Sequence, residues 1–324
     1  MSQEYIIGVD LGGTQIRAAM TDREGTVLNH TRRLTLAPEG PDAGLGRMKE
    51  AIREALGNAG WDTVLGIGIA APGPLDLEMG TIIRGINLPA WDNVPIRDII
   101  TEEFGVPVYL NNDANLAALA EHRFGAGRGC SNLVYLTVST GIGGGIIVDG
   151  RLLLGAHGWG GEPGHTIVEP AGPPCTCGSA GCLEAMASGP AIAQRAAGLI
   201  REGRVSSLSE AVHRGTELTA EMVGKAAQQG DDLALEVIGR AAYYLGIGVV
   251  NLINIFDPDV VILGGGVSKL GPLLFDPVRA MVRKSALTET QRETPIVPAA
   301  LGDQVGVLGG VALVMTEQLD QGGR

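Results

Sequence analysis

Short runs of β-branched and apolar residues alternate along this chain with longer segments of helical periodicity. Three such runs near the N-terminus predict strands joined by tight turns in an antiparallel meander. A helical stripe of apolar positions then predicts a helix over Gly44–Ala59, followed by a buried strand over Val64–Ala70. The three predicted strands are Tyr5–Val9, Gln15–Thr21 and Thr26–Leu36.

The opening pattern recurs in the middle of the chain. A helix over Ile96–Phe104, a strand over Val106–Leu110 and a helix ending near Phe124 lead into the second copy. Its strands are predicted at Asn132–Val138, Gly144–Val148 and Arg151–Leu154, with Asp149 and Gly150 as a two-residue hairpin turn. The later half is mainly helical, with helices predicted at Pro190–Ile200, Thr219–Gln229 and Asp232–Phe256, and one further strand at Val260–Leu263.

The repeated unit indicates an α/β protein of two similar domains with mixed sheets, facing each other across a central cleft. We place a small N-terminal domain at residues 1–112 and a larger one at 113–302. The apolar C-terminal segment, about 303–324, is expected to form a helix that packs back on the first domain.

Composition and charge narrow the function classes. The chain has 324 residues, 45% of them hydrophobic, which is ample for two cores. A net charge of -12 argues against nucleic acid or an anionic membrane surface as a partner, since both require a basic face. The longest charge-free apolar stretches read as too short or too glycine-rich to span a bilayer, and the N-terminal residues do not resemble an export signal. We therefore expect a cytoplasmic protein.

A Gly/Pro-rich segment holds three of the 4 cysteines. His165, Cys175, Cys177 and Cys182 together supply one nitrogen and three sulfurs, the ligand set of a closed tetrahedral Zn²⁺ site. A disulfide or a group of buried thiols is the alternative, but a disulfide requires an oxidising compartment. The pattern favours structural zinc, which would stabilise the segment that carries it.

Three glycine clusters each follow a predicted strand. Backbone N–H groups at such turns can bind phosphate oxygens, although each cluster alone could be an ordinary tight turn. None has the spacing of a P-loop or of a dinucleotide fingerprint. Three clusters at strand ends favour a nucleotide polyphosphate held between the domains. The clusters are Gly12-Gly13-Thr14, Thr140-Gly141-Ile142-Gly143 and Gly264-Gly265-Gly266.

Four carboxylates are candidates for chemistry. Asp10 ends the first strand beside a phosphate loop and could hold Mg²⁺ or simply cap a turn. Asp113 precedes a helix and could be its N-cap or a base that accepts the proton of a substrate hydroxyl. Glu162 and Glu184 lie near the cysteine segment, where they could bind a polyhydroxyl ligand or remain solvated surface groups.

Several motifs together resemble the ROK family of sugar kinases and repressors, nearly from end to end. The cysteine segment is the most specific of them, and its continuation through Glu184 to Gly189 is most similar to the bacterial glucokinases of that family. The other motifs are Ile7–Thr14, Ala71–Pro74, Asn87–Trp91, Asn112–Asn115, Gly161–His165 and Val261–Gly266.

The resemblance implies two ribonuclease-H-like domains of the actin and hexokinase type, a homodimer or homotetramer, and phosphorylation of the 6-hydroxyl of D-glucose by ATP with Mg²⁺. It implies Asp113 as the catalytic base. The implied sugar contacts are Gly73, Asn87, Asn112, Asp113, Glu162, His165 and Glu184, and the implied nucleotide contacts are Gly12, Gly13, Thr14, Thr140, Gly141 and Gly265, with Asp10 beside them. His165 would present one ring nitrogen to zinc and the other to the sugar.

Two departures from the family pattern are present. Gln15 stands where relatives often have Lys, and Pro163 stands between Glu162 and Gly164 where Ile or Leu is usual. Other hexoses, namely fructose, mannose, N-acetylglucosamine or N-acetylmannosamine, stay open as substrates, and polyphosphate stays open as a donor. A sugar-responsive repressor is the rival of another class. Such family members carry a DNA-binding domain before the first strand, which here begins at Tyr5.

Overall fold

The computed structural model describes residues 4–85 and 88–322 and divides the chain into two compact units. Unit 1 comprises residues 1–129, 154–158 and 300–324, and unit 2 comprises 130–153 and 159–299. The helix that begins at Asp113 therefore belongs to unit 1, whereas the sequence suggested a boundary just before it. The physical reason is its packing against the C-terminal helix of the same unit.

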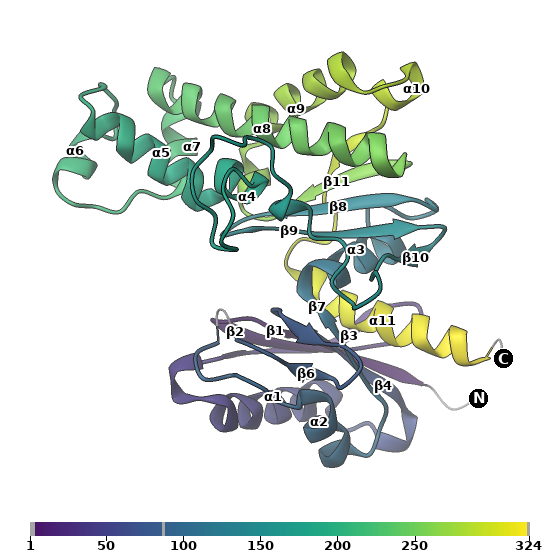
Figure 1. Ribbon diagram of the computed structural model, residues 1–324. Helices are drawn as coiled ribbons and strands as arrows, with labels where there is room; N and C mark the ends of the chain where they lie inside the picture. The colour runs from purple at the N-terminus through teal and green to yellow at the C-terminus, as the bar shows by residue number, and fades with distance from the viewer. Residues whose placement is uncertain (1–3, 86–87, 323–324) are drawn as a thin grey trace. The chain divides into compact units, whose positions relative to one another are not determined.

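Unit 1 is built on a five-stranded sheet of order β3-β2-β1-β4-β7. The first three strands form an antiparallel meander, and β1, β4 and β7 run parallel. Helices α1 (Pro41–Leu56) and α2 (Ile96–Phe104) cover one face, while α3 (Asp113–Phe124) and α11 (Val305–Gly322) form a layer on the other (Figure 1). The strands are β1 (Tyr5–Leu11), β2 (Gln15–Thr21), β3 (Val27–Leu34), β4 (Val64–Ala71) and β7 (Val108–Asn112), with the small pair β5 (Leu75–Asp76) and β6 (Thr81–Ile82) beside them.

Unit 2 repeats this arrangement with a sheet of order β10-β9-β8-β11-β12. Again three strands form an antiparallel meander and the last two run parallel to the first strand of the meander. The long helices α8 and α9 lie side by side over this sheet (Figure 1). The strands are β8 (Leu133–Val138), β9 (Ile142–Val148), β10 (Arg151–Leu152), β11 (Val260–Gly264) and β12 (Ile296–Pro298). The helices are α4 (Leu183–Ala187), α5 (Gly189–Arg201), α6 (Ser209–His213), α7 (Ala220–Gln228), α8 (Asp232–Phe256), α9 (Pro272–Ser285) and α10 (Glu289–Arg292).

The duplicated α/β architecture expected from the sequence is confirmed, and several predicted elements have the observed bounds. Strand β2 and helices α2 and α8 begin and end at the predicted residues. Helix α9 was not predicted, although Leu274, Phe275, Val278 and Val282 are buried along one side of it. An internal Pro277 obscures this pattern, because proline is a strong helix-breaking signal.

Helix α8 is long and apolar enough to cross a membrane by length and composition alone. The sequence-based estimate that no such stretch is long enough was therefore too strict. Most of its side chains are buried in the core of unit 2, where they pack against α4, α7 and α9. A largely apolar helix whose apolar side chains are mostly covered by its own domain is a core helix.

Glycines in the strands allow α11 to approach the sheet of unit 1 closely. A Cβ atom at Gly8 would overlap the carbonyl oxygen of Val307, and one at Gly68 would overlap that of Gly310. Both clashes involve backbone atoms, which cannot move aside as a flexible side chain can. The strands β1 and β4 therefore require glycine at these positions to receive the C-terminal helix.

We expect Gly68→Ala to lower the free energy of unfolding by about 1–3 kcal/mol or more, as overpacking of a core does. Gly46→Ala is the matched control, because Gly46 lies within α1 and a Cβ there meets nothing within 4 Å. Alanine at that helical position should instead raise the free energy of unfolding by about 0.5–1 kcal/mol. Denaturant unfolding measures both. Equal stabilities of the two variants would contradict the packing described here.

A buried carboxylate stabilises the part of unit 1 where the chain crosses between the units. Glu121, at 0% exposure near the end of α3, accepts hydrogen bonds from the backbone N–H groups of Ala126, Ala300 and Leu301 at 2.8, 2.9 and 2.9 Å. These donors belong to the segments that leave and re-enter unit 1. One side chain thus holds both segments against the helix that begins at Asp113.

Candidate functional site

The candidate residues of unit 1 gather at one edge of its sheet. Strands β1, β4 and β7 are parallel, so their carboxyl ends meet at the same edge. Asp10 pairs in register with Ala70, and Ala71 pairs with Asn112. A Cβ atom at Gly73 would lie 3.3 Å from Nδ2 of Asn112, so these two residues are neighbours. Asn87, the remaining candidate in this unit, lies outside the described residues.

Asn112, and not Asp113, is the N-cap of α3. The Asn112 side chain accepts a hydrogen bond from the Ala114 N–H at 2.9 Å. Asp113 is the first residue of the helix, its side chain is exposed, and its Oδ1 lies 2.8 Å from the same N–H. The capping role that the sequence left open for Asp113 is thus filled by its neighbour. The carboxylate remains accessible at the positive end of the helix dipole.

Asp10 lies next to a cation that the sequence did not single out. Nη1 of Arg17 is 3.5 Å from Oδ2 of Asp10, and Nη2 of Arg17 donates to Oε1 of Gln15 at 3.3 Å. Burial raises the pKa of the Asp10 carboxyl, and the positive charge of Arg17 opposes that shift. Gln15 therefore helps to hold an arginine beside the candidate Mg²⁺ ligand. Strand alternation was the available signal, because residues 15 and 17 face the same side of β2.

The turn between β1 and β2 contains Gly12, Gly13 and Thr14. Its backbone is anchored from both sides, since the Gly12 N–H donates to the Gln15 carbonyl at 2.9 Å and the Thr35 hydroxyl donates to the Gly12 carbonyl at 2.6 Å. The Thr14 side chain is exposed at the tip of the turn. The first glycine cluster is therefore a short, well-anchored turn at the same sheet edge as Asp10.

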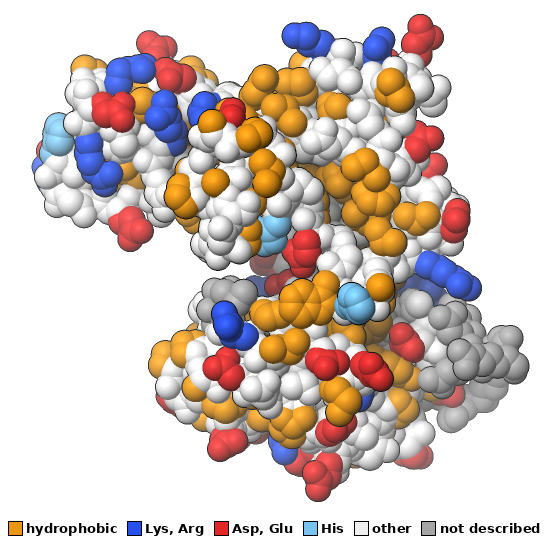
Figure 2. Space-filling model, viewed as in Figure 1, with side chains coloured by type: hydrophobic (Ala, Val, Ile, Leu, Met, Phe, Trp, Pro, Cys, Tyr) orange, Lys and Arg blue, Asp and Glu red, His pale blue; other side chains and the backbone are white. Residues whose placement is uncertain are grey.

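Unit 2 has a cavity of about 910 Å³ at the carboxyl edge of its own sheet. Strands β8 and β11 are parallel, so the second and third glycine clusters follow neighbouring strand ends. Thr140 and Gly266 line the cavity, whereas Gly141 and Gly265 belong to the same turns but are not among its lining residues. Three cations, Arg201, Lys225 and Lys269, also line it, together with two carboxylates, Glu217 and Glu221. In Figure 2, basic side chains appear among acidic ones over the region of α5 to α7.

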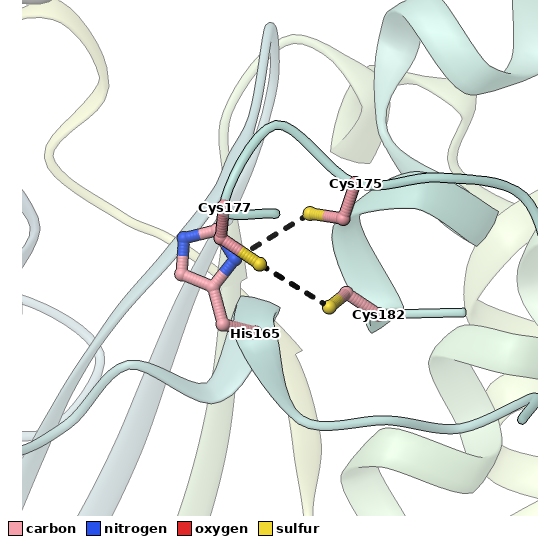
Figure 3. A group of neighbouring side chains, drawn as sticks. All are labelled: His165, Cys175, Cys177 and Cys182. Carbon is pink, nitrogen blue, oxygen red and sulfur yellow. Dashed lines mark hydrogen bonds between the residues drawn. The ribbon is translucent and has the colours of Figure 1, made fainter. Parts of the chain in front are cut away.

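The four candidate metal ligands of unit 2 point toward one another (Figure 3). One ligand atom from each of His165, Cys175, Cys177 and Cys182 can be chosen so that all lie within 4.8 Å of one another. Sγ of Cys177 is 3.7 Å from Sγ of Cys182, and Sγ of Cys175 is 3.7 Å from Nδ1 of His165. A tetrahedral site with Zn–S bonds of about 2.3 Å places two sulfurs about 3.8 Å apart. The cluster is compatible with a bound metal ion of that geometry.

Local structure explains how these ligands come together. His165 ends the 3₁₀ helix Pro163–His165, and Cys182 is the N-cap residue of α4. Between them the backbone folds into a tight turn, with the Cys175 N–H donating to the Ser179 carbonyl at 2.7 Å. Gly178 adopts a φ of 92° within this turn, a conformation that favours glycine. The spacing of the cysteines is thus set by a glycine-dependent turn.

Cys177 and Cys182, whose sulfurs lie 3.7 Å apart, differ in their surroundings. Cys182 is buried, and this desolvation raises its pKa to about 12. Cys177 is exposed, and a backbone hydrogen bond from Ser179 lowers its pKa. A bound Zn²⁺ ion would supply the positive charge that a buried thiolate requires.

Glu162 and Glu184 flank the metal cluster in different ways. Desolvation raises the pKa of the Glu162 carboxyl, the nearby His165 lowers it, and Glu184 raises it. Oε2 of Glu184 accepts a hydrogen bond from the Ile142 N–H at 2.9 Å, and Oε1 accepts one from the Thr176 hydroxyl at 3.2 Å. Glu184 is therefore engaged with two protein segments, a role that its position in the sequence did not indicate.

Pro163, the second departure from the family pattern, packs against the sheet of unit 2. It is buried at the start of its 3₁₀ helix, and a Cβ atom at Gly144 of β9 would overlap its ring. The proline ring thus packs directly on the strand that follows the second glycine cluster. This contact holds the Glu162–His165 turn against the sheet of unit 2.

The comparisons with known proteins agree with the motifs. The ROK family profile matches residues 6–317. The glucokinase of Thermotoga maritima is 38% identical over 97% of this chain and 98% of its own. A crystal structure of a ROK family glucokinase from Streptomyces griseus, in complex with glucose and AMPPNP, has a TM-score of 0.78 at 34% identity, covering 95% of this chain and 98% of that one.

Similarity within the same family extends to regulators. The xylose repressor of Caldicellulosiruptor bescii is 34% identical over 97% of this chain and 79% of the repressor. The family profile matches nearly the whole chain, and both a glucokinase and a repressor relative exceed 30% identity. The chain therefore belongs to the ROK family.

Proposed function

We propose that this protein transfers the terminal phosphoryl group of ATP to the 6-hydroxyl of D-glucose. The observation that carries the proposal is the exposed Asp113 carboxylate at the start of α3, beside Asn112 and at the same sheet edge as Asp10. This arrangement offers a base and a candidate Mg²⁺ ligand at the end of one sheet. The kinase relatives support sugar phosphorylation as the reaction class.

The proposed reaction requires little covalent participation by the protein. The sugar oxygen attacks the γ-phosphorus, the new O–P bond forms, and the bond to the bridging oxygen of ADP breaks. Asp113 accepts the proton released from the sugar hydroxyl. Mg²⁺, held by Asp10 directly or through water, would neutralise charge on the phosphates. Arg17 keeps a positive charge beside Asp10, where Gln15 replaces the lysine of many relatives.

The cavity of unit 2 is the proposed nucleotide site. Its volume of about 910 Å³ is within the range of ligand pockets, and two glycine turns border it. Thr140, Gly141 and Gly265 would bind phosphate oxygens together with Gly12, Gly13 and Thr14 of unit 1. Three basic residues against two acidic ones, Glu217 and Glu221, line the cavity, which favours an anionic ligand in a chain whose net charge is -12.

The proposed sugar contacts are Gly73, Asn87, Asn112 and Asp113 in unit 1, and Glu162, His165 and Glu184 in unit 2. Nδ1 of His165 faces the cysteines, so Nε2 lies on the opposite edge of the ring and can meet a sugar hydroxyl. We propose structural Zn²⁺ in the cluster, with the role of orienting this imidazole. Cytoplasmic location and a homodimer or homotetramer stay predictions.

A coupled assay with a panel of hexoses tests the substrate. With ATP and Mg²⁺ we expect D-glucose to give the highest kcat/KM among glucose, fructose, mannose, N-acetylglucosamine and N-acetylmannosamine. Hydrogen-bonding sites reject a missing or misplaced hydroxyl by up to about 10⁴-fold, so the ranking should be steep. Replacement of ATP by polyphosphate should lower the rate. A higher kcat/KM for another hexose would assign the enzyme to that sugar.

A sugar-responsive repressor is the second candidate, because a xylose repressor covers 97% of this chain at 34% identity. Repressors bind DNA through basic surfaces, and the chain carries 36 acidic against 24 basic residues. A gel shift with operator-like DNA separates the two functions. Sugar-sensitive DNA binding without phosphorylation of any hexose would favour the repressor.

A further inference from the structure

Glu184 connects two parts of unit 2 that the sequence treats as separate motifs. One is the metal segment, defined here as residues 162–184, and the other is the phosphate loop, residues 139–143. The Glu184 carboxylate accepts the Ile142 N–H of the phosphate loop at 2.9 Å. Its other oxygen accepts the hydroxyl of Thr176, which lies between two candidate metal ligands, at 3.2 Å.

The two parts contact each other at further points. A Cβ atom at Gly164, next to His165, would overlap the carbonyl oxygen of Ile142, so backbone packs on backbone there. Just after the metal segment, at the start of α5, the Gly189 N–H donates to the Ser139 carbonyl at the other end of the loop at 2.8 Å. Ser139 and Gly189 both line the cavity of unit 2. Because these contacts are close, a displacement of the metal segment would also displace the phosphate loop, whose residue Ser139 lines the cavity.

The Glu184 contact also determines how the phosphate loop presents its backbone. Because the carboxylate receives the Ile142 N–H, the peptide between Gly141 and Ile142 is held in one orientation. A Cβ atom at Gly141 would lie 2.5 Å from Oε2 of Glu184, which shows how closely the carboxylate packs against this peptide. A carboxylate accepts hydrogen bonds more strongly than a neutral oxygen does, so this contact favours one conformation of the loop.

We propose that Glu184 is a positioning residue for the nucleotide, through which the metal cluster sets the conformation of the phosphate loop. The inference rests on the proposed function, in which the cavity binds the nucleotide. Cys182 is the N-cap residue of α4, and Glu184 lies in the first turn of the same helix. Metal at the cluster holds Cys182 and the Cys175–Cys177 turn, and thereby both ends of the Glu184 hydrogen-bond network. Loss of the metal releases that network and weakens nucleotide binding at a site that contains no metal ligand.

Equilibrium binding of a fluorescent ADP analogue, without sugar, tests the role of Glu184. We expect Glu184→Ala to raise the Kd about tenfold or more, as loss of a charge-assisted hydrogen bond does. Glu184→Gln should raise the Kd less, because the amide oxygen can still accept the Ile142 N–H. Glu169→Gln is the matched control in the same segment, since Glu169 accepts from the Tyr244 hydroxyl at 3.0 Å and does not contact the phosphate loop. Zinc content and thermal unfolding, measured on each variant, establish that the proteins are folded and loaded.

Metal removal supplies the second arm of the test. Chelation of the wild-type protein should raise the Kd for the analogue by a factor similar to that of Glu184→Ala. Chelation of Glu184→Ala should add little, because both changes act through one network. Wild-type affinity in the folded, metal-free protein or in folded Glu184→Ala would overturn the coupling between the metal cluster and the phosphate loop. It would leave the proposed nucleotide site intact. Failure of the metal-loaded wild-type protein to bind the analogue would instead overturn the proposed nucleotide site, and the coupling with it.

Discussion

Asp113→Asn is expected to lower the turnover number by roughly 10²–10⁴-fold while glucose binding is retained, the range typical for loss of a general base. Asparagine matches aspartate in shape and can still accept the Ala114 N–H, so the start of α3 should be preserved. The asparagine side chain cannot, however, accept a proton from the sugar hydroxyl. Steady-state kinetics with saturating ATP, together with direct measurement of glucose affinity, separates these effects.

Asp98→Asn is the matched control for this substitution. Asp98 is an exposed carboxylate in the first turn of α2, so its replacement also removes a negative charge from the beginning of a helix in unit 1. The cost to helix stability should be similar, about 0.3–1 kcal/mol, but turnover should remain normal. Turnover of Asp113→Asn within a few-fold of wild type would remove Asp113 from the role of base.

Cys177→Ser should abolish stoichiometric metal binding and lower kcat/KM for glucose by roughly 10²-fold or more. The reason is geometric, because a misplacement of about 1 Å in a substrate-positioning group can cost that factor. Cys177 is exposed, so the substitution removes a thiolate with little loss of packing. Metal analysis of protein purified without added zinc should give about one equivalent for wild type and almost none for the variant.

Cys130→Ser serves as the control for this experiment, since Cys130 is the cysteine outside the cluster. It should retain both metal and activity. Full activity of metal-free Cys177→Ser would show that the cluster is dispensable for the sugar site. A wild-type protein that purifies without metal would remove the zinc proposal itself.

Much of the fold was predictable because local patterns and tertiary packing agree. Strand β2 alternates and α8 is largely apolar, and both were predicted with their observed bounds. The pattern did not indicate that α3 belongs to unit 1, because α3 follows β7 directly and its packing partner α11 lies about 180 residues later. The packing of two helices so far apart in the chain does not change the local hydrophobic periodicity of either helix, so it cannot be predicted from that periodicity.

In the candidate site, too, local motifs were predictable and contacts between distant residues were not. The cysteine spacing and His165 indicated a metal cluster, and the structure brings their ligand atoms together. Asn112 as the helix cap, Arg17 beside Asp10 and the link from Glu184 to Ile142 were missed. Only strand alternation pointed to Arg17. The partner of Glu184 is 42 residues away in sequence, and no motif connects them.

The sequence by itself determined the duplicated α/β plan, the family and the set of candidate metal ligands, because hydrophobic periodicity, glycine at turns and cysteine spacing are local properties of a chain. Tertiary structure decided which cation accompanies Asp10, and that Glu184 joins the metal segment to the phosphate loop. Those assignments depend on which groups meet across strands and loops after folding. A hydrogen bond forms only where the packed backbone brings donor and acceptor within about 3 Å.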